Sequence, residues 1–337
     1  MTAQATILGL QGPVLDAGER GFFADADPWG FILFGRNVEN PKQLARLCVA
    51  LRDSVGRDAP IFIDQEGGRV QRLRSPHWRE APPAAAFGAL YAHDKEAAAE
   101  AVWINHRLIA AELRASGIDA DCAPCLDLAI EGADAVIGDR AYGGDPEMIA
   151  ALGRSAMDGL MAGGVAPVIK HIPGHGRADA DSHFHLPRVG ETLEVLQDTD
   201  FRPFAALHDA PMAMTAHIVY DALDRDAPAT MSEAAIAFMR ETIGFDGLLM
   251  TDDLSMKALT GSFAERTQRA LNAGCDVVLH CNGDRAEMEA IAEAAPRLEG
   301  PALKRAQSAE AARQGGEPYD AGKGLARLDR LLSRVAV

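Results

Sequence analysis

The feature that most constrains the fold is a regular alternation of short apolar segments with longer amphipathic ones. Eight runs of four to seven residues are rich in apolar and β-branched side chains, as buried strands are. These runs are Ala5–Leu10, Phe31–Phe34, Ile61–Asp64, Ile118–Cys122, Val165–His171, Met212–His217, Leu248–Asp252 and Asp276–His280. Helix-like stretches lie between several of them, namely Pro41–Val55, Lys95–Ser116, Pro146–Gly163 and Ser232–Ile243. Strands that alternate with helices predict right-handed βαβ units and a parallel sheet.

The number of these units selects one architecture of the α/β class. About eight strand–helix units in roughly 300 residues predict a TIM-type (β/α)8 barrel. A doubly wound open sheet is the alternative that the same pattern allows. The 337 residues contain no internal repeat, no low-complexity linker and no break in composition. We therefore expect a single-domain barrel over residues 1–300, with a short C-terminal helical tail over residues 301–337 packed on or extending from it.

Composition excludes several classes of partner. With 33 Lys and Arg against 49 Asp and Glu, the formal net charge is −16, which disfavours binding to a nucleic-acid backbone. No apolar stretch reaches the ~20 residues of a membrane-spanning helix, and no secretory signal is apparent at the start. The five cysteines are scattered and odd in number, which favours a reducing compartment over a disulfide framework. We expect a cytoplasmic protein with no nucleic-acid and no membrane partner.

Polar side chains follow four of the predicted strands at the point where each strand ends. These strand ends are Asp64–Arg69, Lys170–His171, Thr215–His217 and Thr251–Asp253. Because the carboxyl ends of parallel strands meet at one mouth of a barrel, we expect these side chains to converge where the active sites of this fold lie. Any one of them could be a buried structural group. Four together favour a functional site, although they do not identify a reaction.

The segment KHIPGHG that follows the Val165–His171 strand holds two histidines. His171 and His175 have the i, i+4 spacing of metal ligands on a helix, but the proline and glycines among them disfavour a helix. A mobile loop over the site is the better interpretation. Further along, Asp181 stands two residues before His183, close enough to orient the imidazole and raise its pKa. Such a pair is a competent general acid/base, although a loop histidine with a chance neighbour fits as well.

Two adjacent carboxylates follow the Leu248–Met250 run. Alternation along a strand sends the side chains of Asp252 and Asp253 to opposite faces. If one projects into the barrel mouth, the other turns toward the helix layer or the following loop. A carboxylate kept ionised by cations such as Lys170 or Arg140 could attack an electrophilic carbon or stabilise a positive one.

Five motifs in a fixed order resemble glycoside hydrolase family 3. They are IDQEGGRVQR, IGDRAYG, KHIPGHG, DSH and TDDLSM. The resemblance extends over about residues 5–295 and is specifically to the bacterial cytoplasmic β-N-acetylhexosaminidases of cell-wall (peptidoglycan) recycling. It implies a single barrel that cleaves non-reducing terminal β-N-acetylglucosamine (GlcNAc), with GlcNAc-1,6-anhydro-N-acetylmuramic acid, with or without its peptide, as the expected substrate. We expect no cofactor and no metal, and a monomer or weak dimer.

The resemblance also implies roles for individual residues. Asp252 becomes the nucleophile, His183 the general acid/base, and Asp181 the group that orients His183. The implied sugar-binding residues are Asp64, Arg72, Arg140, Lys170 and His171. The implied reaction is a retaining double displacement, in which Asp252 attacks the anomeric carbon while His183 protonates the leaving oxygen.

Three alternatives stay open. The first is a metal-dependent barrel hydrolase with zinc ligands from His171, His175, His183, His185, His217 and Asp252. The second is a sugar-binding barrel without catalysis. The third is a phosphorolytic N-acetylglucosaminidase of the same family, in which phosphate replaces water. Cys122 and Cys125 form a lone CxxC, which we interpret as structural.

Overall fold

A computed structural model of the chain describes residues 2–132, 136–178, 180, 182 and 185–334. Within these residues, eight strands close into a barrel in which all neighbouring strands are parallel. Around the barrel the order is β1, β12, β11, β9, β7, β6, β3, β2. The strands are Gln4–Leu8 (β1), Pro28–Leu33 (β2), Ile61–Ile63 (β3), Ala120–Asp121 (β6), Ala166–Ile172 (β7), Met212–Thr215 (β9), Leu248–Asp253 (β11) and Val277–His280 (β12). The predicted (β/α)8 barrel is confirmed, and the open sheet is wrong because the sheet closes.

Each of the eight predicted strand segments contains residues of one barrel strand. Two further pairs of short strands were not predicted. Gln65–Gly67 (β4) pairs with Val70–Gln71 (β5) in antiparallel fashion, and Arg188–Val189 (β8) pairs with Val219–Tyr220 (β10) in parallel. With two or three residues each, these strands are too short to show a periodic pattern.

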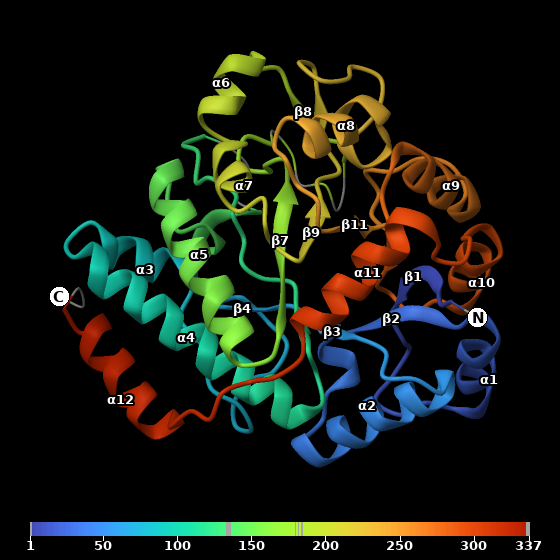
Figure 1. The fold of residues 1–337 in the computed structure, drawn as a ribbon, viewed down its shortest axis with the longest axis horizontal. Coiled ribbons are helices and arrows are strands. Elements are labelled where there is room, and N and C mark those ends of the chain that lie inside the picture. Colours follow the sequence, from blue (N-terminus) through green and yellow to red (C-terminus); the bar gives the residue numbers. More distant parts are fainter. Residues whose placement is uncertain (1, 133–135, 179, 181, 183–184, 335–337) are drawn as a thin grey trace.

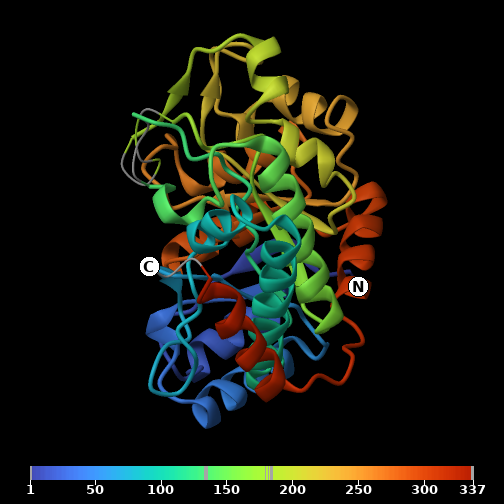
Figure 2. The ribbon, with the colours of Figure 1, turned by 90° about the vertical axis from the view of Figure 1, so that its left-hand side faces the viewer.

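Helices surround the barrel on the outside (Figures 1 and 2). They are Ala17–Ala26 (α1), Pro41–Val55 (α2), Ala84–Tyr91 (α3), Lys95–Ser116 (α4), Pro146–Ala162 (α5), Leu193–Asp198 (α6), Arg202–Ala206 (α7), Glu233–Glu241 (α8), Phe263–Ala273 (α9), Arg285–Ala294 (α10), Gly300–Ala312 (α11) and Ala321–Leu332 (α12). The four predicted helices correspond to α2, α4, α5 and α8. As predicted, Ser232 caps α8, because its hydroxyl accepts the amide hydrogen of Ala235.

The C-terminal segment is helical and packs on the barrel. Helix α11 covers the amino-terminal end of the strands, where Ala306 and Ala309 are buried against the inner core, and the indole of Trp29 donates a hydrogen bond of 2.7 Å to Glu310. Helix α12 lies against α4. The division at residue 300 stays a prediction. None of the described helices is long and apolar enough to cross a membrane.

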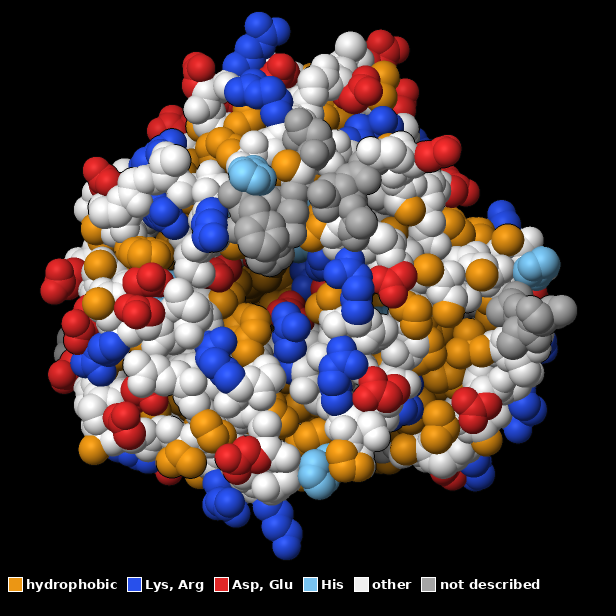
Figure 3. Space-filling view, turned by 180° about the vertical axis from the view of Figure 1, so that it is seen from behind, with side chains coloured by type: hydrophobic (Ala, Val, Ile, Leu, Met, Phe, Trp, Pro, Cys, Tyr) orange, Lys and Arg blue, Asp and Glu red, His pale blue; other side chains and the backbone are white. Residues whose placement is uncertain are grey.

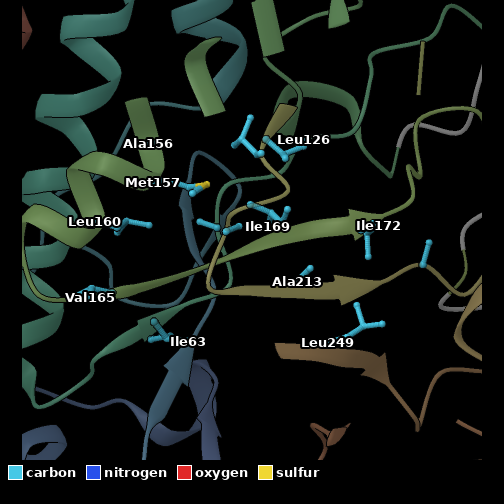
Figure 4. Packing of buried hydrophobic residues seen from close by; sticks show 14 of the residues in the cluster. Ile63, Leu126, Ala156, Met157, Leu160, Val165, Ile169, Ile172, Ala213 and Leu249 are labelled. Atoms are coloured by element: carbon cyan, nitrogen blue, oxygen red, sulfur yellow. The ribbon is translucent and has the colours of Figure 1, made fainter. Parts of the chain in front are cut away.

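Strand alternation decides which side chains face the barrel interior. Ile169, Ala213 and Leu249 share one register on β7, β9 and β11 and belong to the core outside the barrel, where Ile169 lies near Met157 and Leu160 of α5 (Figure 4). The next register is Lys170, Met214 and Met250, whose two methionines belong to the inner core. The ammonium of Lys170 therefore enters the mouth of the barrel.

Candidate active site

A cleft of about 480 Å³ lies at the carboxyl ends of the barrel strands. Figure 3 shows a hollow near the centre of one face of the molecule, with acidic side chains inside it and Lys and Arg around its rim. Six of the eight predicted site residues line this cleft: Asp64, Arg72, Arg140, Lys170, His171 and Asp252. The other two, Asp181 and His183, lie outside the described residues. Residues of three of the four predicted strand ends thus converge on the cleft, whereas Thr215–His217 do not line it.

Lys170 lies at the centre of the polar wall of the cleft. Its side chain is only 2% exposed, and its ammonium lies 2.8 Å from Asp64 Oδ1 and 2.6 Å from Glu66 Oε1. Burial by itself lowers the pKa of Lys170, but the two carboxylates raise it by more, so the ammonium stays charged. A buried charge of this kind is tolerated only when it is paired, and here two partners share it.

Two arginines complete the same wall. Arg72 Nη2 lies 2.8 Å from Asp64 Oδ2, while Arg140 forms two hydrogen bonds of 2.9 Å with Glu66. Burial raises the pKa values of both carboxyls, but the cations lower them by more, which leaves the pKa of Glu66 at about 2 and that of Asp64 well below its usual range. Arg72, Asp64, Lys170, Glu66 and Arg140 therefore form an ion-pair chain of alternating charge.

The ion-pair chain corrects one expectation from the sequence. Lys170 and Arg140 were expected to keep Asp252 ionised, but their ion pairs are with Asp64 and Glu66. Glu66 itself was not predicted as a site residue. The signal was present in the motif IDQEGGRVQR, because Asp64 and Glu66 are two residues apart in extended chain and so share a face.

His171 is held by a second carboxylate that the sequence analysis missed. Asp127 is fully buried, and its Oδ2 lies 2.7 Å from His171 Nδ1, while its Oδ1 accepts the backbone N–H groups of His171 (3.2 Å) and His175 (2.6 Å). Burial raises the pKa of Asp127, but His171 and His175 together lower it by more. The carboxylate therefore fixes the ring of His171 at the wall of the cleft. Its only signal in the sequence was its place a few residues beyond the Ile118–Cys122 run.

The described residues contain one group of three side chains with the composition of a metal site. The ligand atoms of Cys125, Asp127 and His171 lie within 4.8 Å of one another. Asp127 already accepts the hydrogen bonds described above and that of the Cys125 thiol at 3.2 Å. The proposed zinc ligand His175 is bonded through Nε2 to Ser182 Oγ at 3.1 Å. These contacts form a hydrogen-bonded support for this side of the cleft.

The KHIPGHG segment has no helix among its described residues, as its proline and glycines predict. His171 belongs to β7, so His171 and His175 do not share a helix face. Residues 173–176 are buried rather than exposed. At Gly176 a Cβ atom would come within 2.3 Å of the carbonyl oxygen of Leu128, so this close approach requires glycine.

Asp252 and Asp253 diverge, as the alternation predicts. Asp252 lines the cleft, and its Oδ1 accepts the N–H of Asp253 at 2.8 Å. The carboxylate of Asp253, which also borders the cleft, turns to the following loop and accepts hydrogen bonds from Ser255 N (2.9 Å) and Ser255 Oγ (2.6 Å). Asp252 is thus the carboxylate of the pair that remains directed at the cleft.

Comparison with known proteins identifies relatives along nearly the whole chain. The family described as "Glycosyl hydrolase family 3 N terminal domain" matches residues 21–313. The chain is 40% identical over 311 residues to the beta-hexosaminidase of Tolumonas auensis, which covers 90% of this chain and 89% of that protein. Among solved structures, NagZ from Neisseria gonorrhoeae is similar with a TM-score of 0.86 at 31% identity, covering 100% of this chain and 98% of that one. The same protein in complex with N-trifluoroacetyl-D-glucosamine gives a TM-score of 0.87 at 30% identity, with 100% and 99% coverage.

Proposed function

The chain belongs to glycoside hydrolase family 3, and we propose that it is a retaining exo-β-N-acetylglucosaminidase. The β-N-acetylhexosaminidase activity follows from relatives named beta-hexosaminidase at about 40% identity. Its substrate in this proposal is GlcNAc-1,6-anhydro-N-acetylmuramic acid, with or without peptide, in cytoplasmic peptidoglycan recycling. The observation that carries the proposal is that Asp252, the ion-pair chain and His171 line the same cleft.

The chemistry of the cleft suits a sugar. A volume of about 480 Å³ lies within the range of small-molecule sites, and the related NagZ binds an N-acylated glucosamine. The ion-pair chain offers fixed charged donors and acceptors, whose hydrogen bonds to hydroxyl groups are stronger than neutral ones. We assign Asp64, Arg72, Arg140, Lys170 and His171 to grip the non-reducing sugar.

The first step of the proposed reaction forms a covalent intermediate. A carboxylate oxygen of Asp252 attacks the anomeric carbon as the bond from that carbon to the glycosidic oxygen breaks. His183, oriented by Asp181, gives its proton to the departing oxygen, which leaves as the hydroxyl of the aglycone. Asp181 and His183 lie outside the described residues, so their roles rest on the resemblance of the DSH motif.

The second step releases the sugar. Neutral His183 removes a proton from water, and the oxygen of that water attacks the anomeric carbon while the ester bond to Asp252 breaks. Two inversions at one carbon give net retention. If phosphate were the acceptor instead of water, the product would be a sugar phosphate. Comparing the products with and without added phosphate distinguishes these two reactions.

A trapping experiment tests the proposal. Wild-type protein is incubated with a 5-fluoro N-acetylglucosaminyl fluoride, digested and mapped by mass spectrometry. We expect the label on Asp252 and hydrolysis of an aryl N-acetyl-β-glucosaminide with little or no activity on the α anomer. A label on another residue would overturn the assignment of the nucleophile. Loss of turnover on chelation, with stoichiometric zinc in the protein, would favour the metal-dependent alternative.

A further inference from the structure

The strand that carries Asp252 leaves its regular ladder before it reaches that residue. Strand β11 pairs with β9 from Leu248 to Met250, and the ladder stops there. On the other side, the register between β11 and β12 shifts by one residue between Met250 and Asp253, which is a β-bulge. Other contacts must therefore hold the segment that presents Asp252 to the cleft.

Side chains replace the ladder on both sides of this segment. Toward β12, Thr251 Oγ1 accepts the N–H of Leu279 at 2.9 Å, and Asp253 Oδ1 accepts the N–H of Cys281 at 3.1 Å. Toward β9, the imidazole of His217 reaches across the gap, with its Nε2 3.1 Å from the backbone carbonyl oxygen of Asp253. His217, two residues beyond the end of β9, thus joins this segment to β11 where the backbone pairing of the two strands has ended.

The hydrogen-bond partners of His217 fix its tautomer. A carbonyl oxygen can only accept, so Nε2 carries the hydrogen that points to Asp253. The ring is fully buried, and burial lowers the pKa of His217, so the imidazole is neutral. Nδ1 must then accept the hydroxyl hydrogen of Thr230, whose Oγ1 lies 2.7 Å from Nδ1 and 3.1 Å from a second acceptor, the carbonyl oxygen of Ala216. Thr230 Oγ1 in turn lies 2.8 Å from Thr215 Oγ1, which can donate to it.

We propose that His217 is a positioning residue for the nucleophile, with the hydroxyl of Thr230 bonded to the other nitrogen of its ring. It acts through the Asp253 backbone, whose N–H in turn holds the carboxylate of Asp252 at 2.8 Å. The inference rests on the proposed role of Asp252. Because a displacement of about 1 Å at a reacting group can cost about 100-fold in rate, removing the bridge should slow attack on the anomeric carbon without weakening the grip on the sugar.

The test compares three variants with wild type and a matched control. His217→Leu removes the donor, His217→Gln keeps an N–H at the end of a side chain of similar reach, and Thr230→Val removes the hydroxyl that holds the other side of the ring. His280→Gln is the control, because His280 is a fully buried histidine at the end of β12 that bonds Glu287 at 2.8 Å. For each protein, kcat and KM on an aryl N-acetyl-β-glucosaminide, the rate of 5-fluoro sugar labelling and the melting temperature are measured.

We expect His217→Leu to lower kcat and the labelling rate by about 10- to 100-fold with KM changed less than about threefold. In His217→Gln, kcat and the labelling rate should recover most of this loss. In Thr230→Val both rates should lie between those of the two His217 variants, and in His280→Gln both should stay within about threefold of wild type. Equal losses of kcat in His217→Leu and His217→Gln, or a change in KM alone, would overturn the proposal. If His217→Leu does not fold, the pair His217→Gln and Thr230→Val decides it. Wild-type turnover and the labelled residue test the proposed function separately.

Discussion

Arg140 holds Glu66 through two hydrogen bonds of 2.9 Å, and their side chains are only 10% and 7% exposed. Glu66 also contacts the ammonium of Lys170 at 2.6 Å, so this carboxylate joins two cations that line the cleft. Without Glu66, Arg140 would lose its carboxylate partner and Lys170 one of its two, and a buried charge that loses its partner is strongly destabilising.

This relationship predicts the effect of Glu66→Gln. The amide keeps one acceptor oxygen but removes the negative charge that two buried cations share. We expect kcat/KM on an aryl N-acetyl-β-glucosaminide to fall at least about tenfold and the free energy of unfolding to fall by about 2–4 kcal/mol. Glu147→Gln, which alters an exposed ion pair with Arg202, is the control and should change neither measurably. An unchanged kcat/KM and an unchanged stability in Glu66→Gln would contradict the importance of the ion-pair chain.

Asp252→Ala should remove nearly all turnover. Without the carboxylate no ester can form at the anomeric carbon, and we expect a loss of about 10³-fold or more in kcat. The side chain borders the cleft rather than the core, so the melting temperature should change little. Steady-state rates and circular dichroism during heating measure the two effects. Near-wild-type turnover would show that another group is the nucleophile.

His183→Ala should separate the two chemical steps. A substrate with a good leaving group needs little protonation, so formation of the intermediate should be nearly normal. Hydrolysis of the intermediate needs a general base for water and should slow by about 10²-fold or more. Stopped-flow measurements should therefore show a burst of aryl alcohol followed by a slow steady state. A variant in which the burst itself is lost would assign His183 a different role.

Asp121 predicts a specific dependence of stability on pH. The carboxyl is fully buried beside the ion-pair chain, and its Oδ1 accepts the N–H of Gln65 at 2.9 Å. Burial raises its pKa to about 8, above that of the unfolded chain, so the folded state holds a proton that the unfolded state releases. Between about pH 4 and 8 this group makes the folded state less stable as pH rises, by up to about 1.4 kcal/mol per pH unit.

Asp121→Asn checks this expectation, because the amide is neutral at every pH. Urea unfolding of wild type and variant should give a difference in stability that grows in favour of the variant from pH 5 to pH 8. Lys170, Asp64 and Glu66 face the same region, but they are present in both proteins and cancel in the difference. A difference that does not change with pH would mean that Asp121 is ionised in the folded protein.

The barrel was predictable because its strands are buried on both sides. Runs such as Val165–His171 are then apolar nearly throughout, and polar residues appear only where the strand reaches the mouth. The six described site residues found from the sequence are strand-end or loop residues of this kind. Short strands such as β8 and the helix α11 lacked a comparable signal.

The pairing of charges could not be predicted in the same way. Glu66 and Arg140 are 74 residues apart, and Asp127 and His171 are 44 apart, so each pair meets only because β6 lies between β3 and β7 in the sheet. From sequence, Lys170 could be placed at the mouth but not assigned to Asp64 and Glu66 rather than to Asp252. That choice depends on which strand ends are neighbours and how far each side chain reaches.

Helix α11 has a consequence for the shape of the substrate. It seals the far end of the barrel, and the interior above it is filled by residues such as Val168, Met212 and Leu248. The cleft is therefore a blind pit with one opening. A glycan cannot thread through such a pit, so only the last sugar of a chain can reach its floor, and both halves of a cleaved molecule must back out the way they entered.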